Sequence, residues 1–350
     1  MASKIIRQKR FIRRNIARTL QLLVHIKPSQ KPITGELKSV VILAQEKLGD
    51  SILLTPLLKN LRHYFPDCEI HLICFSTASA NFFRNDPHIT AVHKVKKDFG
   101  NYFRHVMCRK FDLLFNTKDS PSTNFLLQSA LIRAQYKVGH HHQYHDGLFH
   151  YLLDIDFHTS MALKNCALLT LLKVKLDKEK YRPYLPPAPV SSTMTAWLEQ
   201  STSHACIGLN ISAGSPARYW SEEKWSTLIT QFPEQQFIIF AAPQDSASKQ
   251  RLEQHRNVTA TPATGNLYEV GLLVNKVQLL ITPDTAMVHV ASCYAIPVIG
   301  LYTAAPQDMS RFAPYLVDYE LISSNTPNVG DIEVGVVIRV LKRKLVDNSW

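Results

Sequence analysis

Short runs of mostly apolar residues recur along this chain and constrain its fold more than any other feature. Clear examples are Val40 to Ala44, Ile70 to Phe75, Phe237 to Ala241 and Pro297 to Leu301. Such runs are typical of strands that are buried on both faces of a parallel sheet. Segments with helical periodicity, such as Ile52 to Tyr64, lie between them. The alternation predicts an α/β fold with doubly wound parallel sheets.

A proline-rich stretch divides the chain into two domains. Tyr181 to Pro189 contains four prolines, a composition typical of a linker. We therefore expect an N-terminal arm over residues 1–38, a first domain over 39–185 and a second over 186–350. The last helix, Ile332 to Val346, is expected in the second domain, with packing back onto the first domain as the alternative.

The N-terminal arm carries most of the excess positive charge. Residues 1–38 hold ten Lys or Arg and one acid, whereas the remainder holds 30 basic and 27 acidic residues. The apolar residues of the arm fall near one helical face and are Ile5, Ile12, Ile16, Leu20 and Leu23. A basic amphipathic helix predicts attachment to an anionic membrane surface. A solvated tail and a helix packed on the body are the alternatives.

The sequence argues against nucleic-acid binding, a membrane-spanning helix and a signal peptide. The body has no basic surface interleaved with aromatic residues, so nucleic acid is not an expected partner. The chain has no run of about 18 apolar residues, which argues against a membrane-spanning helix. Thr19 to Ile26 is too short for a signal peptide and lacks a cleavage site. We expect a cytoplasmic protein that is peripheral on the inner face of the cytoplasmic membrane.

The first of three strand-to-helix corners is Gln45 to Asp50. Gly49 suits a tight turn, and Asp50 follows it where the helix is expected to open. An Asp at this position is commonly an N-cap. A carboxylate at the end of a strand is also well placed to act as a general base.

The second corner follows the strand Cys206 to Ile211. Ala213, Gly214 and Ser215 are small enough for backbone N–H groups to approach an anion, and Arg218 adds a positive charge just before a helix. This combination suits a diphosphate group.

The third corner is Thr282 to His289. Asp284, Thr285 and Ala286 lie at the start of a helix, and His289 follows one turn later on the same side. These residues are candidates for the same ligand site. The alternative is a capped helix whose histidine packs inside the domain.

Two further interpretations are weak. Several histidines follow Gly139 and suggest a metal site, but no Cys or carboxylate with ligand spacing accompanies them; they are His140, His141, His142, His145 and His150. A dinucleotide-dependent dehydrogenase is also disfavoured, because no Gly-x-Gly-x-x-Gly motif follows a strand. We therefore expect no metal and no cofactor.

The three corners together resemble glycosyltransferase family 9, the lipopolysaccharide heptosyltransferases. The matching segments are Leu48 to Leu58, Ala213 to Trp220 and Asp284 to His289, and an apolar strand from Ile296 to Tyr302 follows them. The resemblance spans about residues 39–316 in the right order. The chain departs from the family where Arg218 replaces the common Lys and Ala286 the usual Gly. Thr303 to Pro306 replaces the usual Gly-Pro-Thr-Asp turn.

The resemblance implies a GT-B arrangement of two Rossmann-like domains facing a cleft. It implies an inverting, metal-independent glycosyltransferase that moves heptose from ADP-heptose to the lipopolysaccharide or lipooligosaccharide core. Asp50 would be the catalytic base, and the second domain would bind the nucleotide sugar. The residues that would form this donor site are Ala213, Gly214, Ser215, Arg218, Asp245, Asp284, Thr285, Ala286 and His289. Asp245 is the candidate for the ribose or base contact.

The acceptor site is expected to be basic, because the inner core is phosphorylated. Lys118 is the best-placed candidate, since it follows the strand that ends at Asn116; Arg62 and Arg133 are alternatives. Other functions on this scaffold remain open: transfer from another nucleotide sugar, epimerisation of a nucleotide sugar, or binding of a nucleotide sugar or glycan without turnover.

Overall fold

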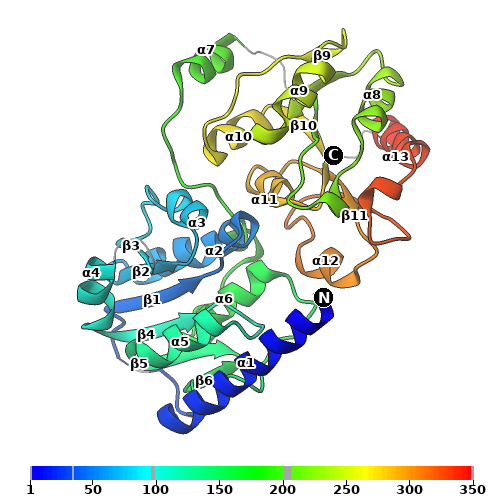
Figure 1. The fold of residues 1–350 in the computed structure, drawn as a ribbon. Coiled ribbons are helices and arrows are strands. Elements are labelled where there is room, and N and C mark those ends of the chain that lie inside the picture. The colour runs from blue at the N-terminus through cyan, green and yellow to red at the C-terminus, as the bar shows by residue number, and fades with distance from the viewer. Residues whose placement is uncertain (1, 34, 96–98, 201–205, 348–350) are drawn as a thin grey trace. The chain divides into compact units, whose positions relative to one another are not determined.

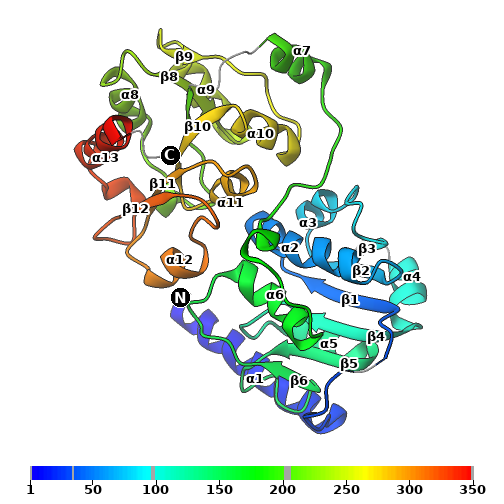
Figure 2. The same cartoon turned by 180° about the vertical axis from the view of Figure 1, so that it is seen from behind.

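The chain forms two compact units, Met1–Tyr181 and Arg182–Trp350 (Figures 1 and 2). The computed structural model describes residues 2–33, 35–95, 99–200 and 206–347. Each unit is built on a six-stranded sheet in which all the described strand pairs are parallel. The predicted α/β fold with two doubly wound sheets is therefore confirmed.

The sheet of the first unit has the order β3-β2-β1-β4-β5-β6. Its strands are β1 (Ser39–Ala44), β2 (Glu69–Cys74), β3 (Ala91–Lys94), β4 (Lys110–Asn116), β5 (Arg133–His140) and β6 (Tyr151–Leu153). The direction of winding reverses between β1 and β4. Ligands of such sheets bind beyond the carboxyl ends of the strands at this reversal point.

Helices cover both faces of this sheet. Buried residues of α2, α3 and α6 pack with one face, and those of α1, α4, η1 and α5 pack with the other. Figure 1 shows α1 running along the sheet beside α5 and β6. The bounds are α1 (Ala2–Val24), α2 (Leu48–Tyr64), α3 (Thr77–Phe82), α4 (Phe99–Tyr102), the π-helical turn η1 (Phe103–Met107), α5 (Thr123–Leu131), α6 (Met161–Leu171) and η2 (Lys178–Tyr181).

The second unit repeats this topology. Its sheet has the order β12-β11-β10-β7-β8-β9, so β7 and β10 meet at the reversal point. The strands are β7 (Cys206–Asn210), β8 (Gln236–Phe240), β9 (Val258–Thr259), β10 (Val277–Pro283), β11 (Val298–Tyr302) and β12 (Tyr319–Ser323). The carboxyl ends of β7 and β10 are therefore the expected place for a ligand in this unit.

One face of the second sheet packs with α8, α9 and α13, while α10 and α11 lie on the other side, as Figure 2 shows. The bounds are α7 (Ser192–Gln200), η3 (Pro216–Arg218), α8 (Glu222–Thr230), η4 (Pro243–Asp245), α9 (Ser246–Leu252), α10 (Leu267–Val274), α11 (Ala286–Cys293), α12 (Pro306–Arg311), η5 (Val329–Asp331) and α13 (Val334–Asp347).

The arm predicted for residues 1–38 contains α1, and this helix packs on the first unit. Ala17 is completely buried, and Leu20 and Val24 pack against the same core. Ile12 and Leu23 of the predicted stripe are exposed, whereas Leu20 packs against the core. The side chain of Ile5, which belonged to that stripe, lies outside the described residues. No helix among the described residues has the length and apolarity needed to cross a bilayer.

Candidate active site

Asp50 lies in the first turn of α2, beyond the carboxyl end of β1. The helix begins at Leu48, ahead of the expected opening at Asp50, and its N-cap is Lys47. Asp50 is therefore not the N-cap, although a carboxylate in a first turn is favoured by the helix dipole. Its side chain is half-buried.

Hydrogen bonds tie the β1 corner to its neighbours. The hydroxyl of Ser76, which follows β2, donates to the backbone oxygen of Glu46 at 2.8 Å. The hydroxyl of Ser51 donates to that of Ser79 at 3.0 Å, and both side chains are completely buried. These bonds fix the loop that precedes Asp50, so its carboxylate is held at a defined place on the edge of the sheet.

Lys118 joins the end of β4 to the same corner. Its Nζ donates to Gln45 Oε1 at 3.2 Å and lies 3.5 Å from Glu46 Oε2. The ammonium group also lies over the ring of Phe125, 5.6 Å from its centroid. The structure thus brings Lys118 and the loop that leads to Asp50 together at the reversal point of the first sheet.

A buried ion pair beside Lys118 was not predicted. Lys164 on α6 is only 2% exposed, and its Nζ lies 2.8 Å from Asp119 Oδ2. The same ammonium donates to the backbone oxygen of Phe157 at 2.9 Å. The sequence offered one signal for this pair, a lysine within the apolar run of α6.

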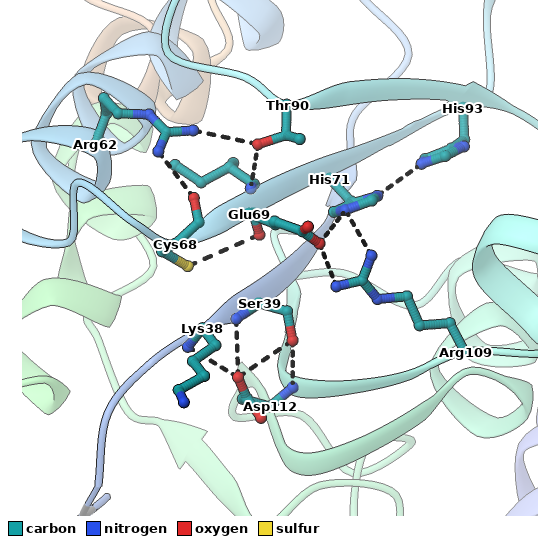
Figure 3. Close-up of polar contacts among 11 residues, drawn as sticks. Lys38, Ser39, Arg62, Cys68, Glu69, His71, Thr90, His93, Arg109 and Asp112 are labelled. Atoms are coloured by element: carbon teal, nitrogen blue, oxygen red, sulfur yellow. Dashed lines mark hydrogen bonds and ion pairs between the residues drawn. The ribbon is translucent and has the colours of Figure 1, made fainter.

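The other two acceptor candidates lie at the opposite, amino-terminal edge of the first sheet. Arg62 donates to the backbone oxygen of Cys68 at 2.9 Å and to Thr90 Oγ1 at 3.2 Å, just before β2 and β3 (Figure 3). Arg133 is the first residue of β5 and donates to the backbone oxygen of Cys108 at 2.9 Å. Both arginines hold turns in place at that edge, away from the corner of Asp50.

Asn210 organises the reversal point of the second sheet. It is the last residue of β7, and its Nδ2 lies 2.9 Å from Thr282 Oγ1 and 3.1 Å from Thr285 Oγ1. The same amide donates to the backbone oxygen of Ser212 at 3.1 Å. One buried side chain therefore joins the second and third predicted corners.

Asp245 lies beside the second corner and is bound to it. The hydroxyl of Ser212 donates to Asp245 Oδ2 at 2.5 Å and accepts a bond from the N–H of Ala242 at 2.7 Å. The hydroxyl of Tyr219 also donates to Asp245 Oδ2, at 3.0 Å. The carboxylate therefore has a fixed orientation beyond the end of β8.

Arg218 is the cation of this site and lies between two carboxylates. Its Nη1 is 3.0 Å from Asp284 Oδ2 and donates to the backbone oxygen of Asp284 at 3.1 Å. Its Nη2 is 3.3 Å from Asp308 Oδ2. Asp308, on α12, was not among the residues identified from the sequence.

The small residues of the two corners offer backbone donors. Gly214 is exposed, and a Cβ there would meet open space. Thr285 is the N-cap of α11, and its hydroxyl accepts a bond from the N–H of Met287 at 3.2 Å. Ala286 is the first helical residue. The start of this helix lies beside Arg218, through the contact with Asp284.

His289 is enclosed within the second unit. It is 3% exposed, and burial lowers its pKa to about 4, so the ring is neutral at pH 7. Within the described chain, its Nδ1 is buried and has no hydrogen-bond partner. This burial favours a packing role beneath the third corner.

The histidines that follow Gly139 do not assemble a metal site among the described residues. His145 is completely buried, and its Nδ1 makes a bond of 2.7 Å with the backbone oxygen of His140. His142 packs 5.7 Å from His145, measured between ring centroids. This cluster shapes the loop between β5 and β6.

Comparison with known proteins identifies related sequences. A model of glycosyltransferase family 9 (heptosyltransferase) matches residues 101–335, and a family of unknown function matches residues 8–174. Lipopolysaccharide heptosyltransferase 3 of Escherichia coli is 24% identical over 284 residues, which cover 73% of this chain and 81% of that protein.

Solved structures share the fold. A family 9 glycosyltransferase from Veillonella parvula is 19% identical, with a TM-score of 0.71 over 89% of this chain and 99% of that one. The E. coli heptosyltransferase WaaC with ADP is 13% identical, with a TM-score of 0.64 over 88% and 98% of the two chains. The similarity covers both units, which confirms the predicted fold class.

Proposed function

The chain belongs to glycosyltransferase family 9, the heptosyltransferase family, and on this premise we propose that it transfers heptose from ADP-heptose to a lipopolysaccharide core. Membership of this family makes the chain a glycosyltransferase. The choice of sugar and acceptor is supported by the related lipopolysaccharide heptosyltransferase of E. coli and by the solved WaaC structure with ADP.

The second unit binds the nucleotide in this proposal. Arg218 contacts the diphosphate, helped by backbone N–H groups of Ala213 to Ser215 and of the first residues of α11. Preorganised donors of this kind stabilise the charge that grows on the leaving phosphate. Asp245 contacts the ribose through one carboxylate oxygen, because the hydroxyls of Ser212 and Tyr219 already hold the other, Oδ2, in place. His289 supports the start of α11 from within the unit.

The first unit supplies the base and part of the acceptor site. The acceptor hydroxyl oxygen attacks the anomeric carbon, the bond from that carbon to the phosphate oxygen breaks, and ADP leaves. Asp50 takes the proton of the attacking hydroxyl. A single displacement of this kind inverts the anomeric centre. Lys118 binds an anionic group of the acceptor.

In the second unit, Asp284 and Thr285 contact the donor.

The observation that carries this proposal is the position of Arg218 beside Asp284 and the start of α11, at the reversal point of the second sheet. A cation at this place suits a diphosphate better than a neutral ligand. The test is a panel of ADP-, UDP- and GDP-sugars offered with a truncated lipopolysaccharide. Mass spectrometry should show one added heptose with ADP-heptose, and addition from another donor alone would contradict the choice of substrate.

The proposal places the enzyme at the inner face of the cytoplasmic membrane, attached through α1. One side of this helix packs on the first unit, but Leu22 and Leu23 are 81% and 75% exposed, and Phe11 is also exposed. Arg14 and Arg18 are exposed on the same helix. Apolar side chains flanked by arginines suit the surface of an anionic bilayer. Packing on the body and membrane attachment are thus compatible in one helix.

A further inference from the structure

The two carboxylates that hold Arg218 differ in how firmly they hold it. Asp284 is bound through both its side chain and its backbone oxygen, at 3.0 and 3.1 Å, and its side chain is 8% exposed. Asp308 makes one longer contact of 3.3 Å, and its side chain is 19% exposed. Asp284 is therefore the anchor of the guanidinium group, and Asp308 is the weaker partner.

The segment that carries Asp284 is also more firmly packed than the helix that carries Asp308. Asp284 directly follows the buried strand β10, and its N–H donates to the backbone oxygen of Leu301 on β11 at 3.0 Å. Asp308 lies on α12, a six-residue helix with no buried residue. Elements with little buried surface move at low free-energy cost. A ligand of Arg218 can therefore displace Asp308 more easily than Asp284.

The charges of this cluster favour such a displacement. A diphosphate is anionic, so a carboxylate that already contacts the guanidinium competes with it for the same donor group and repels it. The repulsion is relieved when Asp308 leaves the guanidinium and the phosphate oxygen takes its place.

The side chain of Arg218 suits this arrangement. A guanidinium is a planar fork that can hold two carboxylates at fixed angles, whereas an ammonium group is a point charge. Arg218 uses its two terminal nitrogens in this way, one toward Asp284 and the other toward Asp308.

We propose that Asp308 competes with the donor diphosphate for Arg218 and thereby sets the affinity of the nucleotide site. The inference rests on the proposed function, because it assumes that Arg218 binds the diphosphate. In the free enzyme Asp308 pairs with Nη2 of the guanidinium. The diphosphate exchanges with it on binding, and Asp308 returns to Arg218 when the nucleoside diphosphate leaves.

The test is isothermal titration of ADP into the full-length chain and its variants. Asp308→Asn should tighten ADP binding by about 5- to 20-fold, because a competing charge is removed. Asp308→Glu keeps the charge and should bind ADP as the wild type does. Asp331→Asn removes the same charge from an acid that accepts a bond from Thr326, and it should change the affinity by less than about 2-fold. In an Arg218→Lys background, the gain from Asp308→Asn should shrink.

The outcomes separate this inference from the proposed function. Unchanged or weaker ADP binding by Asp308→Asn would overturn the inference, as would an equal gain in Asp331→Asn or an undiminished gain beside Arg218→Lys. These outcomes would leave the proposed heptose transfer by the wild type uncontradicted. Tighter ADP binding by Asp308→Asn without any heptose transfer would support the inference and contradict the choice of substrate. Failure of the wild type to bind ADP, UDP or GDP would contradict both.

Discussion

The hydroxyl of Thr55 donates a hydrogen bond of 2.7 Å to the backbone oxygen of Ile52. That oxygen would receive the N–H of residue 56 in a regular helix, but residue 56 is a proline inside α2. The threonine side chain therefore supplies the donor that the proline lacks. The helix that carries Asp50 therefore continues past the proline and ends at Tyr64.

Thr55→Val should consequently destabilise the first unit. The substitution keeps the shape of a completely buried side chain but leaves a buried carbonyl without this donor. A loss of about 1–3 kcal/mol in the free energy of unfolding is expected, measured by urea unfolding. Thr55→Ser should recover most of it. Equal stability of the valine and serine variants would show that the hydroxyl has no such role.

Lys118→Glu should raise the Michaelis constant for the acceptor and leave ADP binding unchanged. The lysine lies at the edge of the first sheet that carries Asp50, where a phosphorylated acceptor would bind. Arg133→Glu is the matched control, because it reverses the same charge at the opposite edge. Steady-state kinetics with varied acceptor test the prediction. An equal effect of both variants would remove Lys118 from the acceptor site.

The exposed face of α1 should hold the protein on anionic vesicles. Leu22→Ser combined with Leu23→Ser should weaken flotation with such vesicles several-fold, because each apolar side chain loses contact with the bilayer. The melting temperature should stay the same, since both residues are exposed. Leu20→Ser should instead lower the melting temperature, because Leu20 packs on the core. Full vesicle binding by the double variant would exclude this face as the anchor.

The stability of the second unit should fall as the pH is lowered from 7 to 5, in part because of His289. Its pKa in the folded chain is about 4, against an ordinary value of 6.5. The unfolded chain therefore takes up a proton below pH 6.5 that the folded chain resists. At pH 5 the loss is on the order of 2 kcal/mol. Chemical unfolding of His289→Leu should show a weaker pH dependence than the wild type, and an identical dependence would contradict the assignment.

The central strands were predictable from the sequence because burial on both faces leaves an unbroken apolar run. Val40 to Ala44 was predicted and the strand is Ser39–Ala44; Cys206 to Ile211 was predicted and the strand is Cys206–Asn210. Two edge strands of the second sheet, β9 and β12, were missed. β9 has only two residues, and β12 includes the exposed Tyr319, so neither has an apolar signature.

The corners of the site were predictable for a different reason, namely their place at strand ends. The sequence pointed to Asp50, Arg218 and Asp284 as candidates, but it did not point to Asp308 or to the pair of Lys164 and Asp119. Asp308 and Asp119 lie close in sequence to segments already singled out, but their contacts with Arg218 and Lys164 form only through the fold. Aspartates are common at such positions, so the residue type alone did not distinguish them.

Asp50→Asn tests the chemistry of the proposed step. It should lower the rate of transfer about 10²- to 10⁴-fold, because the amide cannot accept the proton of the attacking hydroxyl. ADP binding should be unchanged, since Asp50 lies in the first unit and the proposed nucleotide site in the second. Asp67→Asn, which alters an exposed acid of the first unit, is the control and should retain full activity.

The most direct measurement is mass spectrometry of a heptose-deficient lipopolysaccharide after incubation with ADP-heptose and the purified enzyme. The wild type and Asp67→Asn should each add one heptose to the acceptor, whereas Asp50→Asn should leave almost all of it unmodified in the same time. An acceptor that gains no heptose with the wild type, or gains it equally fast with Asp50→Asn, would contradict the account.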